Sequence, residues 1–112
     1  MTRAAILVLI CLLPPAARGD DVTARKNFAR ELADCSALYQ QASEQDGLGP
    51  GPRQQLAAQS LSALQAAAGV SDRRFAITEQ QRALAGGGTV SSGLCDQIMA
   101  HPNERFAYWR GH

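Results

Sequence analysis

One stripe of apolar residues at helical spacing runs through the first half of the chain. Its members follow one another at intervals of four, three, four and three residues, which places them on one face of an α-helix. The stripe predicts a helix over about residues 22–45, ended by the Asp-Gly pair at 46–47 and followed by a short, stiff GLGPGP connection. The stripe consists of Phe28, Leu32, Cys35, Tyr39 and Ala42.

Two further helices are predicted in the middle of the chain. The second begins at Pro52, because proline is preorganised for the first helical turn, and it runs to Ala68. Its face is narrow and made mostly of small residues, so a neighbouring helix can approach closely. The third starts at a cap formed by Ser71 or Asp72 and reaches residue 84 or 85. Its periodicity is weaker, and its apolar residues are Phe75, Ile77 and Leu84.

The end of the chain predicts a pair of short helices. A glycine-rich break at residues 86–93 precedes a fourth helix over about residues 91–100. Pro102 then pushes His101 out of the helical region and begins a last short helix, which puts Phe106 and Trp109 on one face. The apolar side of the fourth helix is Leu94, Cys95, Ile98 and Met99. The pattern therefore predicts an all-α fold, a small bundle of three main helices plus a short C-terminal helix pair.

The first nineteen residues have the organisation of a secretory signal. Arg3 is followed by an apolar run over residues 4–13 and by a small-x-small cleavage site at Ala17 and Gly19. The run is shorter than the roughly 20 apolar residues that a spanning helix needs. We therefore expect a signal peptide at residues 1–19 and a single helical domain at residues 20–112. The expected location is the periplasm, with no stable membrane insertion after signal cleavage.

Cysteine usage agrees with export. Cys11 would leave with the signal, so Cys35 and Cys95 remain as a pair. An even pair in an exported chain predicts one disulfide, here a staple between the first and fourth helices. Closing a loop of this size stabilises a fold by about 4 kcal/mol in the chain-entropy interpretation. The alternative is two free thiols.

Charge excludes some classes of partner. The full chain has 11 Lys and Arg against 10 Asp and Glu. Removing Arg3 and Arg18 with the signal leaves nine basic residues against ten acidic ones, a formal charge of about −1. Nucleic-acid binding and anionic lipid binding both ask for clustered basic charge, so we expect neither.

No segment combines the residues that catalysis or metal binding requires. The GGGTVSSG loop lacks the lysine of a phosphate-binding loop. Ser91 or Ser92 would have His101 as its one internal histidine partner, and two isolated histidines do not form a zinc site. Four carboxylates stay open as either a general acid and base pair or as exposed helix charges: Glu31, Asp34, Asp96 and Glu104. We expect no enzyme activity, no cofactor and no metal.

The aromatic C-terminus has the strongest functional signal. Tyrosine, tryptophan and arginine are enriched at interface hot spots, but the same aromatic residues are suited to closing the core of a small bundle. Both interpretations stay open, with the two arginines expected on the outer side of the last helix. The possible partner-binding face comprises Arg105, Phe106, Tyr108, Trp109 and Arg110.

Both ends of the domain resemble a group of small exported helical proteins of proteobacteria, most of them without a known activity. The resemblance rests on Asp34, Cys35 and Tyr39 and on Cys95, Pro102, Arg105, Tyr108 and Trp109. It implies export, helices and a disulfide, and it implies no activity. We therefore expect an exported protein-interaction module, such as an inhibitor, immunity or accessory factor, that binds another periplasmic protein without catalysis. The alternative is a periplasmic holdase, because acid-stress chaperones are similarly short, helical and tied by one disulfide.

Overall fold

The computed structural model describes residues 2–112, with side chains described from Asp21 onward. Within these residues it has five α-helices, one π-helical turn at Ala83–Gly87 and no strand, which confirms the predicted all-α class. The predicted signal peptide, residues 1–19, lies outside the residues whose side chains are described, so its cleavage stays a prediction. The helices are α1 (Thr2–Ser43), α2 (Pro50–Val70), α3 (Arg73–Arg82), α4 (Ser92–Ala100) and α5 (Pro102–Arg110).

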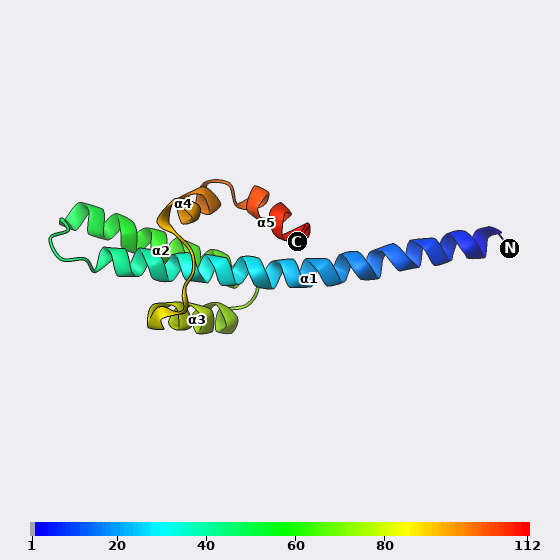
Figure 1. The fold of residues 1–112 in the computed structure, drawn as a ribbon, viewed down its shortest axis with the longest axis horizontal. Helices are drawn as coiled ribbons and strands as arrows, with labels where there is room; N and C mark the ends of the chain where they lie inside the picture. The colour runs from blue at the N-terminus through cyan, green and yellow to red at the C-terminus, as the bar shows by residue number, and fades with distance from the viewer. Residues whose placement is uncertain (1) are drawn as a thin grey trace.

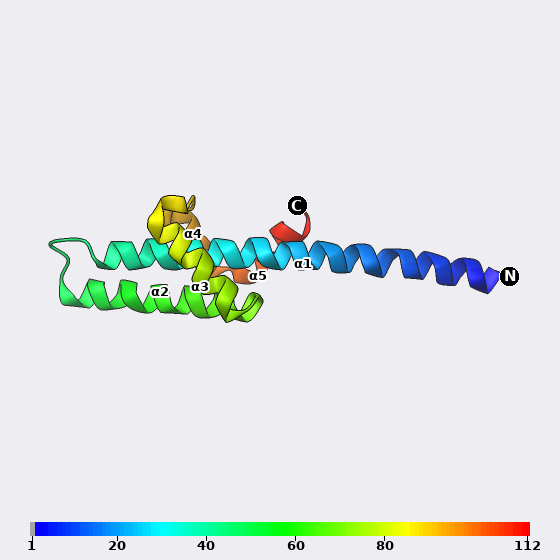
Figure 2. The same cartoon turned by 90° about the horizontal axis from the view of Figure 1, so that it is seen from below.

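The first two helices form an antiparallel hairpin, and the other helices cover its two faces. Helix α3 lies on one face of the hairpin and crosses it obliquely, whereas α4 and α5 lie on the opposite face (Figures 1 and 2). Helix α1 also extends beyond the bundle on its N-terminal side (Figure 1). The three main helices and the short C-terminal pair are thus arranged as predicted, with α1 at the centre.

The central position of α1 explains its burial. Phe28, Leu32, Cys35 and Tyr39 of the predicted stripe are all buried. Burial also extends around the helix over residues 31–37, because α2, α3, α4 and α5 all contact it. Polar side chains on this stretch are therefore enclosed and need partners within the protein.

Small residues allow α1 and α2 to lie close together, as predicted. The Ser36 hydroxyl donates to the Ser60 carbonyl at 2.8 Å, and the Ser60 hydroxyl donates to the Ser36 carbonyl at 2.8 Å. Ala63 and Ala67 of α2 are fully buried beside this contact. Helix α2 begins at Pro50, two residues before the predicted start, because both Pro50 and Pro52 fit the first turn, where main-chain N–H groups have no helical partner.

The face that α3 presents to the hairpin differs from the apolar residues that its sequence suggested. Ala76, Gln80 and Ala83 are buried, whereas Ile77 is 38% exposed. The small alanines let α3 lie close over the hairpin, and Gln80 donates through its amide to the Ser36 hydroxyl at 2.9 Å. Asp72 is the N-cap, since its carboxylate accepts a hydrogen bond from the Phe75 amide at 2.8 Å.

The predicted disulfide is present between Cys35 of α1 and Cys95 of α4. Both cysteines are fully buried, and the bond closes a loop across 60 residues of sequence. It fixes α4, and with it the start of α5, against the C-terminal part of α1. No helix in the described part of the chain combines the length and the hydropathy needed to cross a bilayer.

Candidate functional site

Helix α4 forms one wall of a cleft near the C-terminus. Ser91 caps the helix, because its hydroxyl accepts a hydrogen bond from the Leu94 amide at 3.2 Å. Cys95 and Ile98 are buried, and Leu94 and Met99 pack against the core beside them, which confirms the predicted apolar side of this helix. The opposite side of α4 is free to face solvent.

A sharp corner at His101 and Pro102 separates the two C-terminal helices. His101 has φ −135° and ψ 63°, which is outside the helical region, and Pro102 occupies the first turn of α5. This geometry confirms the predicted interruption and its cause, the steric restriction that proline imposes on the residue before it. The corner turns α5 back along α1 (Figure 1).

The inner side of α5 closes the core, as one of the two interpretations expected. The Phe106 ring lies 5.8 Å from the Phe28 ring, centroid to centroid. The Trp109 indole nitrogen donates to Glu31 Oε1 at 2.9 Å. Phe106 and Trp109 are partly buried and share this face, as their i, i+3 spacing predicted.

Arg105 corrects one expectation, because its side chain does not lie on the outer side of α5. Its Nε and Nη2 donate to the two carboxylate oxygens of Glu31 at 2.8 and 2.6 Å. The Glu31 side chain is 7% exposed, so its charge is enclosed by α5 and requires a cation there. The hydrogen bonds that Arg105 donates to this carboxylate raise the pKa of Arg105. Arg110, in contrast, lies outward and pairs with Asp21 at 2.9 Å.

The outer side of α5 presents an ordered aromatic group. Tyr108 is 41% exposed, and the guanidinium carbon of Arg105 lies 4.2 Å from the centre of its ring. On the other side the His112 ring stacks on Tyr108 at 4.0 Å. Because Arg105 is itself held by Glu31, the tyrosine is fixed by a chain of contacts that begins in the core.

Together these helices form a cleft of about 230 Å³ between α4 and α5. Leu94 and Ile98 supply its apolar part. The polar lining is Gln97, His101, Glu104 and Arg105, with Tyr108 at the edge. Two members of the predicted partner-binding face, Arg105 and Tyr108, therefore line the cleft, whereas Phe106 and Trp109 point into the core and Arg110 lies elsewhere on the surface.

The four carboxylates that were open as an acid and base pair lie in separate surroundings. Glu31 binds α5, and Asp96 accepts a hydrogen bond from the Tyr39 hydroxyl at 2.7 Å. Burial and this hydrogen bond raise the pKa of Tyr39. Glu104 lines the cleft and Asp34 faces α3, so they form no catalytic pair. Among the described residues, no group of three potential ligands could hold a metal ion.

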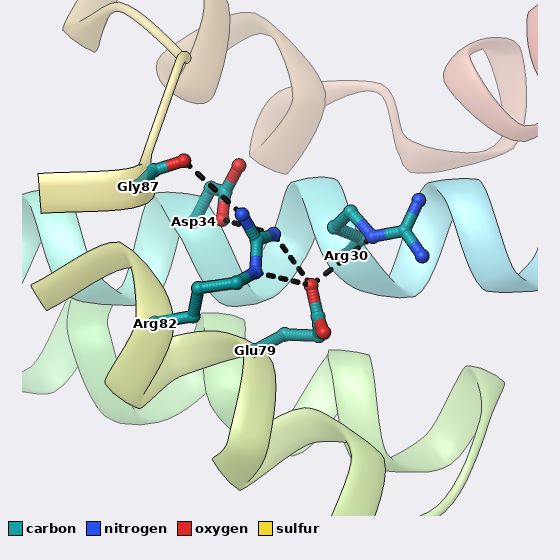
Figure 3. Close-up of polar contacts among 5 residues, drawn as sticks. All are labelled: Arg30, Asp34, Glu79, Arg82 and Gly87. Atoms are coloured by element: carbon teal, nitrogen blue, oxygen red, sulfur yellow. Dashed lines mark hydrogen bonds and ion pairs between the residues drawn. The ribbon is translucent and has the colours of Figure 1, made fainter. Parts of the chain in front are cut away.

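A second polar cluster fastens α3 to α1 (Figure 3). Glu79 accepts hydrogen bonds from Arg82 and from Arg30, and Arg82 also donates to the Gly87 carbonyl at 3.3 Å. Burial opposes ionisation of Glu79, but the two arginines outweigh it and lower the pKa of Glu79. Its hydrogen bonds in turn raise the pKa of Arg82.

Asp34 is the member of this cluster whose carboxylate is least completely hydrogen-bonded. Its Oδ1 is buried without a hydrogen-bond partner among the described residues, and Arg82 Nη2 lies 4.0 Å away. Burial raises the pKa of Asp34, and the Arg82 charge and the Thr89 main-chain amide offset only part of that effect. The cluster is structural, because all of its cations are directed at its own carboxylates and main-chain groups.

Sequence reasoning missed both polar clusters for different reasons. Glu79 and Arg82 have the i, i+3 spacing of an ion pair on one helix, so that contact could have been predicted from the sequence. Glu31 and Arg105 are separated by 74 residues, and no local pattern relates them.

Comparison with protein families, curated proteins and solved structures found no match. The resemblance to exported proteins of proteobacteria therefore stays an expectation.

Proposed function

We propose that this protein is an exported binding domain that recognises a segment of another protein in the cleft between α4 and α5, without catalysing a reaction. The Cys35–Cys95 disulfide supports a non-reducing compartment, because such bonds persist mainly in exported proteins. The predicted signal peptide agrees with the same location.

The observation that carries the proposal is the preorganised Tyr108 at the edge of the cleft. An exposed tyrosine normally loses rotamer freedom when it binds a partner, and that loss weakens binding. Here Arg105 and His112 already hold the ring from two sides. Tyrosine and arginine are also the residues over-represented at interface hot spots.

The size of the cleft favours a protein segment over a small molecule. Its volume of about 230 Å³ is below the roughly 300 to 1,000 Å³ typical of small-molecule sites. Leu94 offers an apolar contact to a partner side chain in this cleft, and Gln97 and His101 supply polar groups beside it. No serine, threonine or cysteine lines the cleft, so it offers no such nucleophile to His101.

A peptide display selection with the oxidised full-length protein tests the proposal. The selected peptide is titrated into the isotope-labelled protein, and amide shift changes are mapped by NMR. We expect the changes to centre on α4 and α5, and Tyr108→Ala to weaken binding about 30-fold, as for a hot-spot residue. Leu61→Ala, an exposed apolar residue on α2, is the matched control and should leave the affinity unchanged.

Two results would overturn this assignment. Shift changes confined to α2 and α3 would place binding on the opposite face of the hairpin. Equal affinities for wild type and Tyr108→Ala, with both proteins folded by circular dichroism, would show that the cleft is not the recognition site.

A further inference from the structure

An apolar groove lies between α2 and α3, away from the α4–α5 cleft. One part, of about 340 Å³, is lined by residues of both helices, including Leu61, Leu64 and Ile77. A second part, of about 310 Å³, shares Leu61 and Leu64 with the first and continues toward the end of α1. Leu61 is 55% exposed and Ile77 is 38% exposed, so two large apolar side chains stand open to solvent here.

The exposed side of α2 is unusual because it has no charge beyond Arg53 in the first turn. No charged residue occurs from Gln54 to Ser71, although a helix facing solvent normally has charged residues on its outer face. Ala57, Ala58 and Leu61 are exposed in this stretch. A solvent-facing surface of this kind is characteristic of a helix that another helix covers.

Charge is instead concentrated at the two ends of the groove, with opposite signs. Arg73 and Arg74 are exposed where α2 meets α3, and Glu44 and Asp46 are exposed in the loop between α1 and α2. Arg53 also lies at the loop end, but its guanidinium donates to the carbonyls of the turn, including Ser43 at 2.8 Å. One end is therefore basic and the other mildly acidic.

Helix α1 strengthens the basic end. Ser36 of α1 and Ser60 of α2 are in direct contact, and the two helices are antiparallel. The number of residues from Lys26 to Ser36 equals the number from Ser60 to Val70. Lys26 and its neighbour Arg25 therefore lie level with the end of α2, and both are exposed. Asp72 offsets one of these charges, since it caps α3 at the same end.

We propose that a second copy of this chain docks on the groove, with the two α2 helices antiparallel about a two-fold axis near Leu61. A two-fold axis brings each central residue against its own copy, so a charge there would face a like charge. The uncharged middle of α2 meets that condition. The antiparallel direction also places the basic end of each copy against the acidic loop of the other, which a parallel arrangement would not do.

The dimensions set the expected strength of this dimer. Helix α2 has 21 residues and is about 30 Å long, so each end lies about 15 Å from the axis. A strip about 30 Å long and two helices wide buries about 600 Å² on each copy. A total near 1,200 Å² is at the lower end of specific interfaces, so we expect a reversible dimer with a micromolar dissociation constant.

Sedimentation velocity of the oxidised full-length protein, over micromolar to millimolar concentrations, tests the dimer. Wild type should change from monomer to dimer, and Leu61→Glu should stay monomeric because it places two like charges at the axis. Leu61→Lys serves as a second variant should the first fail to fold. Tyr108→Glu, an exposed change on the opposite face, should dimerise as wild type does.

A charge exchange tests the antiparallel arrangement itself. The double variant Arg73→Glu with Arg74→Glu has two acidic ends, and Glu44→Arg with Asp46→Arg has two basic ends. We expect each double variant alone to dimerise at least ten-fold more weakly than wild type, and an equimolar mixture to recover the wild-type affinity as a heterodimer. Circular dichroism should show both folded, since all four side chains are exposed.

Three outcomes would overturn the proposal. They are a wild-type protein that stays monomeric at millimolar concentration, a Leu61→Glu variant that dimerises as wild type does, and a mixture of charge variants that associates no better than its components. None of these outcomes bears on the α4–α5 cleft, because that test measures peptide binding on the opposite face of the hairpin.

Discussion

The contact between Glu31 and α5 gives the sharpest test of how this fold is held together. Glu31→Gln keeps the shape of the side chain but removes the charge that Arg105 and Trp109 bind. Arg105 donates two hydrogen bonds to the carboxylate, and its side chain is 22% exposed. Water can therefore replace part of what the guanidinium loses.

The size of the effect follows from this partial burial. A hydrogen bond between charged groups contributes about 1.5–3 kcal/mol, and breaking a fully buried pair costs about 3–5 kcal/mol. The amide oxygen of glutamine keeps one acceptor, and Arg105 keeps some contact with solvent. We therefore expect Glu31→Gln to lower the free energy of unfolding by about 2 kcal/mol, which corresponds to roughly 10 °C in melting temperature for a domain of this size.

Trp109 makes the assay specific, because it is the one tryptophan in the chain. Its fluorescence reports on α5 during urea unfolding, while far-ultraviolet circular dichroism reports on all the helices. Asp21→Asn is the matched control, since its exposed pair with Arg110 should contribute less than about 1 kcal/mol. A loss for Glu31→Gln no larger than that of Asp21→Asn would refute the view that the enclosed carboxylate anchors α5.

Three further changes test other parts of the fold by thermal melting. Cys35→Ser or Cys95→Ser should lower stability by about 4 kcal/mol under oxidising conditions, and reduction of wild type should reproduce that loss; an unchanged melt would mean that the bond does not act as a staple. Burial raises the pKa of Asp34, so the contribution of this side chain to stability should fall as the pH rises above about 3.8. Asp34→Asn should therefore melt higher than wild type at neutral pH and equally well below that pH, and identical curves would contradict this. Gly86→Ala should lower stability by about 1 kcal/mol because Gly86 has φ 106°, whereas Gly69→Ala within α2 should raise it by up to about 1 kcal/mol; equal shifts would refute the backbone explanation.

Features that depend on neighbours in sequence could be predicted from the chain alone. The stripe from Phe28 to Tyr39, the interruption at Pro102 and the cap at Asp72 each follow from the preferences of residues within a turn or two. The disulfide could be predicted because only one pairing of cysteines was left once Cys11 was assigned to the signal peptide. Such local rules fixed the number and type of the helices and much of their ends.

Features that depend on how the helices meet could not be predicted in the same way. The sequence of α3 marks Ile77 as a core residue, but the close crossing over the hairpin buries Ala76 and Gln80 of α3 and Ala83 of the following turn instead. Arg105 shows the same limit, since its role follows from a carboxylate enclosed on α1. The charge of Arg105 suggested a place on the surface. The structure places it inward because Glu31 would otherwise be a buried charge without a partner.

The two proposals together make a specific statement about binding strength. The groove is lined by α2 and α3, and the cleft is lined by α4 and α5. Helices α4 and α5 lie on the face of the hairpin opposite α3 (Figures 1 and 2). An antiparallel dimer through the groove would therefore leave both clefts open. A partner that presents two copies of its recognised segment would bind the dimer with an avidity about 10² to 10⁴ times the affinity of one cleft, provided that its segments span the two sites. Leu61→Glu should remove this gain while leaving the affinity of each cleft for a single peptide unchanged, which separates the contribution of the dimer from that of Tyr108.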